Sequence, residues 1–490
     1  MFRTLLEKEL KNVLFGPKFP ATFIICSLLI IVSIVIGIQD YKAAVRSYDA
    51  AVQLEEQMLS ERHSWRSLST RVYRKPDPMQ IFVSGVTHDI GRFSPVSERQ
   101  SVRLQHSHYS EDSIFAVFRF FDLSFIYQVV LSLFAVLFTF NAVNGEREHG
   151  TLQLIFSNAV SRTQYIAAKY IGSWLGLVIP LFIPLLAGML IVIFSGVPVT
   201  GGHWATLGAF IGVSTLYFSF FIALGIFVSA WTRQSSASFL ILLMLWVSFV
   251  LIIPRLGMMA AGRLISVPSI AEVDGRIDAF SDERWDHYME YLQERFRQRN
   301  KEMEGMTEAQ QQAYRDEHLW DWTEETDNTR KTVQTDIAEF TKTVEDDLRL
   351  KKAAQEELAF LLARLSPVSS YKLASMQLAG THSRMKERYE REIERFKEGF
   401  IEYSTKKAEE AGNDRAGFSI SVGSGGLSFS TGQQGKTTID TGELPRFNAA
   451  AVSIADTIQA AVPDFIILLL LTAALLSGGY IIFLRYDVRV

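Results

Sequence analysis

The chain alternates between long uncharged blocks and long segments dense in charge. Five long apolar blocks lack Asp, Glu, Lys and Arg altogether. The longest, 170–232, is more than twice as long as one membrane-spanning helix, which needs about 20 apolar residues. It contains a Gly- and Pro-rich turn signal at 195–202, so it divides into two helices. The sequence therefore excludes a wholly soluble protein and predicts six spanning helices, at 19–39, 122–145, 165–194, 204–232, 234–254 and 464–484.

The positions of Lys and Arg predict how these helices are oriented, because short loops rich in Lys and Arg stay in the cytoplasm. Basic residues precede the first predicted span, and Arg162 lies between the second and third, whereas the loop between the third and fourth has none. We therefore expect both termini, including the tail 485–490, and the loop 146–164 to be cytoplasmic. Two long segments, 40–121 and 255–463, would then lie outside the membrane.

The first 18 residues have the spacing of an amphipathic helix that ends at Gly16 and Pro17. We expect this helix to lie in the membrane interface and to turn into the first span. An ordinary cytoplasmic helix is the alternative. The residues of the predicted apolar face are Phe2, Leu5, Leu6, Leu10, Val13 and Leu14.

The larger outer segment contains three charged stretches in which apolar residues recur every three or four positions. This spacing predicts long helices packed as a stalk or bundle. Between 412 and 442, apolar residues alternate with serines around a Gly-rich turn, which is typical of a β-hairpin or of a flexible loop. The predicted fold class is mainly α, with a six-helix transmembrane domain, a large and mostly helical extracytoplasmic domain, and a small β-hairpin. The stripes are Leu292 and Phe296; Val333, Ile337, Phe340, Val344 and Leu348; and Met385, Tyr389, Ile393, Phe396, Phe400 and Tyr403.

Little in the chain indicates catalysis, a metal or a cofactor. The net charge of −4 provides no basic field for nucleic acid, and Cys26 is the only cysteine. Gly435-Lys436-Thr437 is a chance match to a phosphate-binding loop, since Ser430 stands where that motif needs glycine. His106 and His108, near Glu111 and Asp112, are more typical of a solvated surface than of a metal site. Charge stops at the ends of the predicted spans, so energy for transport would come from a partner.

The most specific local feature is the predicted cytoplasmic loop after the second span. A short apolar helix lies between a charged turn and a new helix start, which favours a peg inserted into a groove on a partner protein; a helix resting on the membrane interface is the alternative. Ser161 and Gln164 fit a capping box that opens the third span. The candidate partner-contacting residues are Glu146, Arg147, Glu148, Gly150, Thr151, Leu152, Leu154 and Phe156.

This loop resembles a signature of ABC-2 type exporter permeases, E-x-E-x-G-T-L followed by S-R and K, here Glu146 to Leu152, Ser161-Arg162 and Lys169. The segments 365–369, 378–381 and 483–489 are similar to the subgroup with large extracytoplasmic inserts, which includes the permeases of nitrous-oxide reductase maturation and gliding motility.

The resemblance implies a permease of the bacterial inner membrane whose loop docks on a separate ATP-binding subunit. Two copies of that subunit would hold the ATP and magnesium, and a second permease, identical or homologous, would complete the path through the lipid. Such a protein couples ATP hydrolysis to export or to mechanical signalling, with an extracytoplasmic protein as a further candidate partner. The alternative is a membrane-anchored scaffold or sensor with a protein-binding outer domain and no ATPase.

Overall fold

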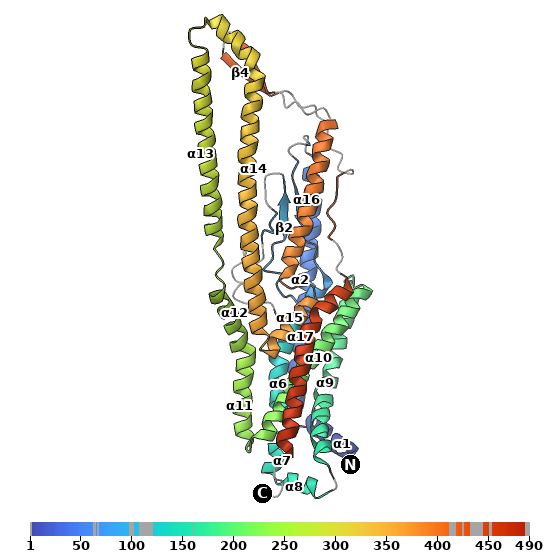
Figure 1. The fold of residues 1–490 in the computed structure, drawn as a ribbon. Helices are drawn as coiled ribbons and strands as arrows, with labels where there is room; N and C mark the ends of the chain where they lie inside the picture. Colours follow the sequence, from blue (N-terminus) through green and yellow to red (C-terminus); the bar gives the residue numbers. More distant parts are fainter. Residues whose placement is uncertain are drawn as a thin grey trace. The chain divides into compact units, whose positions relative to one another are not determined.

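The structure is a computed structural model of the whole chain. It describes residues 2–61, 65, 68–97, 102–106, 121–158, 160–410, 418–423, 426–431, 444–449 and 453–485. Helices dominate these residues, and the strands form two small antiparallel pairs. The predicted mainly α, polytopic fold class is confirmed (Figure 1).

Six helices among the described residues are long and apolar enough to cross a membrane, as the hydropathy pattern predicts. Most extend beyond the uncharged blocks, because helix formation continues into the polar flanks. The six are α2 (Lys18–Ser60); Leu123–Glu148, which comprises α5 (Leu123–Phe125), η2 (Ile126–Leu131), α6 (Ser132–Thr139) and α7 (Asn144–Glu148); α9 (Arg162–Phe194); α10 (Gly201–Trp231); Ser235–Leu264, which comprises α11 (Ser235–Val247), η3 (Ser248–Ile252) and α12 (Ile253–Leu264); and α17 (Ile454–Leu484).

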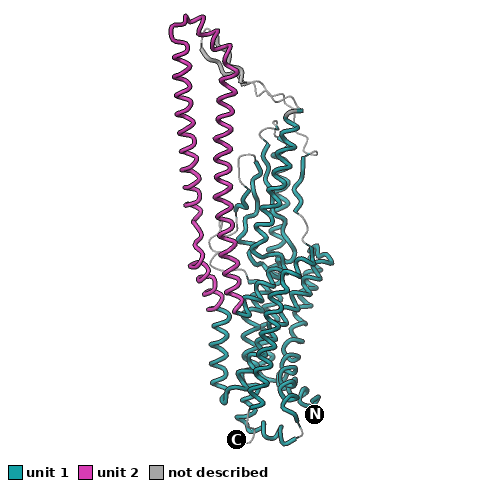
Figure 2. Tube along the Cα trace, viewed as in Figure 1, with its two compact units in different colours: residues 1–251, 366–490 teal, residues 252–365 magenta. Residues whose placement is uncertain are grey.

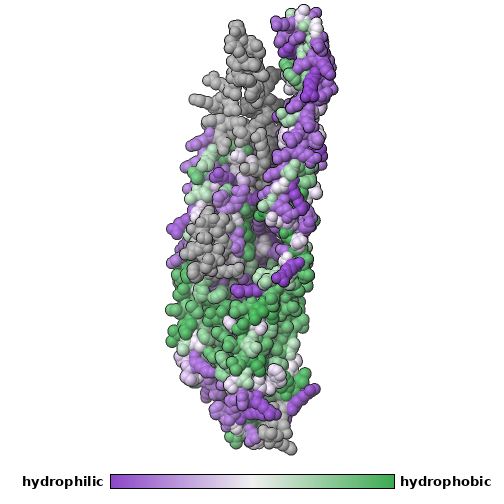
Figure 3. All heavy atoms as spheres, turned by 90° about the vertical axis from the view of Figure 1, so that its left-hand side faces the viewer, coloured by the Kyte–Doolittle hydropathy of each residue, from purple (hydrophilic) through white to green (hydrophobic). Residues whose placement is uncertain are grey.

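The chain divides into two compact units, residues 1–251 with 366–490 and residues 252–365 (Figure 2). In the first unit, α10 is the most enclosed of the spanning helices and packs against α9, α17 and the short helix α15 (Pro367–Leu378). On the face shown in Figure 3, apolar side chains form a band around the spanning helices, with hydrophilic side chains below it. This band is what a bilayer requires of a multi-pass protein.

Two π-helical segments interrupt the spans, and hydroxyl groups from neighbouring helices bond to their carbonyls. In η2, the Gln128 carbonyl accepts a hydrogen bond of 2.8 Å from the hydroxyl of Tyr217 in α10. In η3, the Phe249 carbonyl accepts one of 2.6 Å from Ser366, which is also the N-cap of α15. Tyr217 in turn stacks on Tyr371 of α15, with 4.4 Å between ring centroids. The bulges therefore help fix α15 against the bundle.

The first unit also has a small second core outside the spans. Strands β1 (Thr70–Tyr73) and β2 (Phe93–Val96) pair antiparallel, with Thr70 opposite Val96, and α16 (Arg384–Glu410) packs against them. Four residues of the third predicted stripe, Met385, Tyr389, Ile393 and Phe400, are buried in this core. The expectation of one stalk or bundle is wrong for this stripe, because α16 contacts a sheet that the sequence pattern did not reveal.

The second unit is built on a helical hairpin. Helices α13 (Ile270–Glu302) and α14 (Glu308–Ala363) pack along each other, and Phe280 stacks on Phe340 with 4.0 Å between ring centroids. The Glu325 carboxylate accepts hydrogen bonds from Tyr291 at 2.8 Å and from Arg299 at 3.2 Å, and it also pairs with Arg295. These contacts hold together two helices that bury few side chains.

The predicted hairpin between 412 and 442 is present as β3 (Phe418–Gly423) and β4 (Gly426–Thr431), with Phe418 opposite Thr431. The phosphate-loop match at 435–437 and the histidine cluster beyond His106 lie outside the described residues. Lys169 and Asp464 lie within helices long enough to span a membrane, and both are buried.

Candidate functional site

The loop after the second span is two short helices joined at one glycine. Helix α7 ends at Glu148, and α8 (Thr151–Phe156) begins after Gly150, which has a left-handed backbone with φ +69°. Glycine adopts this conformation without the steric cost of a Cβ. The Thr151 hydroxyl donates to the Glu146 carbonyl at 3.1 Å, closing the turn.

The Glu146 carboxylate is bound by three side chains. The ammonium groups of Lys8 in α1 (Phe2–Leu14) and of Lys169 in α9 lie 2.8 and 2.9 Å from Oε1. The Tyr165 hydroxyl donates to Oε2 at 2.6 Å. Hydrogen bonds between charged groups are the stronger class, so Glu146 ties α7 to both α1 and α9.

Glu148, two residues further on, binds a different helix. Its carboxylate accepts hydrogen bonds from the backbone amide of Ser235 at 2.7 Å and from the Ser235 hydroxyl at 2.6 Å. Ser235 is the first residue of α11, where a negative charge meets the positive end of the helix dipole. The buried Asn144 adds contacts to Ser229 at 3.0 Å and Thr232 at 3.0 Å near the end of α10. The loop is therefore attached to four helices.

Helix α8 has one buried and one exposed leucine. Leu152 is 3% exposed and belongs to the hydrophobic core of the first unit, whereas Leu154 is 68% exposed. Leu152 thus packs against its own chain and cannot offer its side chain to a partner in this arrangement. Phe156 packs on Tyr165 and on Phe483 of α17, with ring centroids 5.4 and 5.8 Å away. Between Glu146 and Phe156, the residues that face solvent are Glu148, His149, Gly150, Gln153 and Leu154.

Helix α9 begins where the sequence indicates a cap. The Ser161 hydroxyl accepts a hydrogen bond from the Gln164 amide at 3.2 Å, which satisfies one of the free amides of the first turn. Arg162 donates to the carbonyls of Phe483 and Leu484 at the end of α17. This cation at a helix C-terminus joins the loop to the last span.

Helix α1 lies directly on the first turns of α9. A Cβ added to Gly172 would lie 2.5 Å from the Cβ of Glu9, and one added to Gly176 would lie 2.9 Å from a Val13 methyl group. These two glycines, one turn apart, let the helices approach closely. The same contact brings the Glu9 carboxylate to 2.7 Å from the Lys169 ammonium, and both side chains are buried.

Comparison with known protein families identifies the family of this chain. The profile of the family described as ABC-2 family transporter protein matches residues 3–488. The chain belongs to the ABC-2 transporter family. No curated protein matches it. An ABC-2 permease is the membrane component of a transporter, which is not itself a catalytic enzyme, and the family in general implies an ABC ATP-binding partner.

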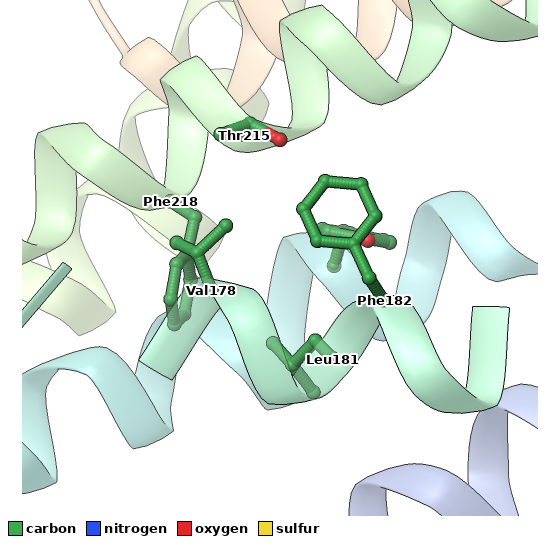
Figure 4. A pocket seen from close by; sticks show the side chains of 6 residues that line it. Val178, Leu181, Phe182, Thr215 and Phe218 are labelled. Atoms are coloured by element: carbon green, nitrogen blue, oxygen red, sulfur yellow. The ribbon is translucent and has the colours of Figure 1, made fainter. Parts of the chain in front are cut away.

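The described residues of this ABC-2 protein hold no cluster of His, Cys, Asp or Glu suited to a metal ion. A small apolar pocket lies between α9 and α10, next to η2 (Figure 4). Val178, Leu181 and Phe182 line it from α9, and Thr215 and Phe218 from α10. Tyr127 of η2 completes it. Such a lining suits packing or a hydrocarbon group rather than catalysis.

Sequence reasoning missed most of the groups that hold the loop of this permease. The sequence pattern does not indicate that the loop is held by Lys8, Glu9, Asn144 and Ser235. It includes Lys169 only as part of the family signature. One signal was present: Glu9 lies four residues from both Leu5 and Val13, on the apolar face of the first helix. A carboxylate on such a face requires a buried partner.

Proposed function

We propose that this chain is the permease subunit of an ABC-2 transporter and that its loop 146–164 docks on a separate ATP-binding subunit. The observation that carries this proposal is the construction of the loop. It exposes a compact face, His149, Gly150, Gln153 and Leu154, which we call the docking face. Behind that face the loop is bonded to α1, α9 and α11, and the adjoining Asn144 of α7 is bonded to α10. A force on the docking face would therefore move the spanning helices.

The wider assembly is proposed with it: two ATP-binding subunits that carry ATP and magnesium, and a second permease, identical or homologous, in a bacterial inner membrane with both termini cytoplasmic. The energy would drive export or be passed as motion to an extracytoplasmic protein. The long hairpin of the second unit supports the mechanical route, because α14 is a continuous helix of 56 residues. The segments 365–369 and 378–381 support membership of the subgroup with large outer inserts.

The docking face gives a direct test. Leu154→Asp places a charge where an apolar side chain would enter the partner. Since burying an unpaired carboxylate costs well over about 1.4 kcal/mol, binding of the ATP-binding subunit should weaken by at least about tenfold. The measurement is the dissociation constant between the purified permease and an ABC ATP-binding subunit from the same organism.

Leu350→Asp is the matched control, because Leu350 is an equally exposed leucine on α14. It should bind as the parent does. Undiminished binding and ATPase stimulation in Leu154→Asp would contradict the docking face. Failure of the parent chain to bind any ATP-binding subunit would favour the scaffold or sensor alternative.

A further inference from the structure

One buried lysine joins the N-terminal helix to the docking loop. The Lys169 ammonium lies 2.7 Å from Glu9 Oε1 and 2.9 Å from Glu146 Oε1, so it holds one carboxylate from α1 and one from α7. Lys169 is 4% exposed. Lys8, also on α1, lies 2.8 Å from the same Glu146 oxygen. We call Glu9, Glu146 and Lys169 the joint.

The joint resists separation because its charges lie away from water. A buried ion pair loses its compensation when one partner is withdrawn, and the charge left behind is strongly destabilising. If α1 moved away from the loop, Glu9 would leave Lys169 and Lys8 would leave Glu146. The close contact of Gly172 with Glu9 adds packing to the same attachment. Helix α1 and the loop are therefore expected to move together.

Movement of α1 acts on the first span, because the connection between them is short. Helix α1 ends at Leu14 and α2 begins at Lys18, and the Phe19 amide donates to the Gly16 carbonyl at 3.0 Å. Glu148 instead connects α7 to the start of α11, where it accepts the hydrogen bond from the Ser235 amide. The two glutamates of the signature, Glu146 and Glu148, thus connect the loop to different spans.

Resting on the proposed function, we infer that Lys169 is a positioning residue that unites α1, α7 and the start of α9 into one rigid body. Through this body, a displacement imposed on the docking face by the ATP-binding subunit reaches α2 by way of α1, in addition to its direct action on α9 and α11. Lys169 contacts neither ATP nor substrate in this account; it acts through Glu9 and Glu146.

The test measures whether α1 and the loop keep a fixed distance during the ATP cycle. Spin labels are placed at Asn12→Cys on α1 and Asn158→Cys at the end of α8, both exposed, in the full chain carrying Cys26→Ser. The chain is assembled with its ATP-binding subunits in nanodiscs, with an excess of unlabelled chain so that one pair of labels is observed per complex. Pulsed EPR then gives the distance without nucleotide and with ATP trapped by a hydrolysis-deficient subunit.

The parent is expected to give the same narrow distance in both states. Lys169→Met should broaden it and reduce ATPase stimulation several-fold, while Lys169→Arg, which keeps the charge, should lie closer to the parent. Lys11→Met removes an exposed α1 cation and should change neither readout. Adding Glu9→Gln to Lys169→Met removes one unpaired carboxylate, so it should recover thermal stability but not the narrow distance. This separates positioning from a merely structural role.

A distance that shifts by several ångström between nucleotide states in the parent would overturn the inference. So would a Lys169→Met variant that keeps the narrow distance and full stimulation. In both cases the subunit still binds, and the proposed function stands. If the subunit binds neither the parent nor any variant, the proposed function fails and this inference fails with it.

Discussion

Glu146 and Glu148 lie on the same short helix but bind different parts of the chain. They stand two positions apart on α7, so their side chains leave the helix in different directions. One carboxylate meets the ammonium groups of Lys8 and Lys169, and the other meets the start of α11 at Ser235. The two glutamates of the family signature thus attach the loop to the chain's own helices and are not part of the docking face.

At the turn itself, Gly150 gives a prediction about backbone conformation. Its φ of +69° costs a residue with a Cβ roughly 1–2 kcal/mol, and most for a β-branched one. Gly150→Val should therefore misplace α8 and lower ATPase stimulation, whereas Gly150→Asn should be mild because asparagine tolerates this conformation. Nothing lies within 4 Å of an added Cβ, so the contrast reports backbone strain rather than a steric clash. Equal activity of the two variants would contradict the assigned turn.

His382, after α15, gives a prediction about pH. Burial and the neighbouring Arg388 and Arg384 lower the pKa of His382 from 6.5 to about 4. As the pH falls below 6.5, the unfolded chain binds a proton that the folded chain does not, so stability is lost down to about pH 4. The melting temperature of the purified protein should fall over this window, and His382→Gln should reduce the fall. An unchanged slope in the variant would show that His382 is not responsible.

At the scale of elements, the contact of α1 with α9 depends on two glycines. Gly172→Leu would push α1 away from Lys169 and cost about 1–3 kcal/mol in overpacking. We expect a lower melting temperature and faster proteolysis after residue 16. Gly208→Leu is the matched control, since a Cβ at this glycine of α10 meets nothing within 4 Å. A Gly172→Leu variant as stable as Gly208→Leu would contradict the packing of α1.

The sequence predicts helices and their faces better than it predicts what those faces meet. The six spans follow from hydropathy alone, and Ser161 indicates where α9 begins. The stripe from Met385 to Phe400 correctly marks a buried face, yet periodicity is the same for a helix facing a helix and one facing a sheet, so its contact with β1 and β2 was missed. The four-residue strands are too short to show alternation. Leu152 and Leu154 look alike in sequence, and only the packing of α8 separates them.

At the scale of the whole molecule, the chain contains two parts besides the bundle of spanning helices, and these two parts are built differently. The core around β1, β2 and α16 belongs to the unit that contains most of the spans, whereas α13 and α14 belong to the second unit, together with α12. From the basic residues of the short loops, we expect the docking face to be cytoplasmic and the hairpin segment to be extracytoplasmic. The account requires this arrangement, because ATP-binding subunits reach only the cytoplasmic side.

The sidedness of the docking face is therefore the most direct test of the central claim. Single cysteines at Gln153 and Trp320, both exposed, are introduced into the Cys26→Ser chain and treated in intact cells with a membrane-impermeant thiol reagent. The account predicts that Trp320→Cys is labelled in intact cells and that Gln153→Cys is labelled only after the membrane is permeabilised. Labelling of Gln153→Cys in intact cells would place the docking face outside, where no ATP-binding subunit can reach it, and would contradict the account.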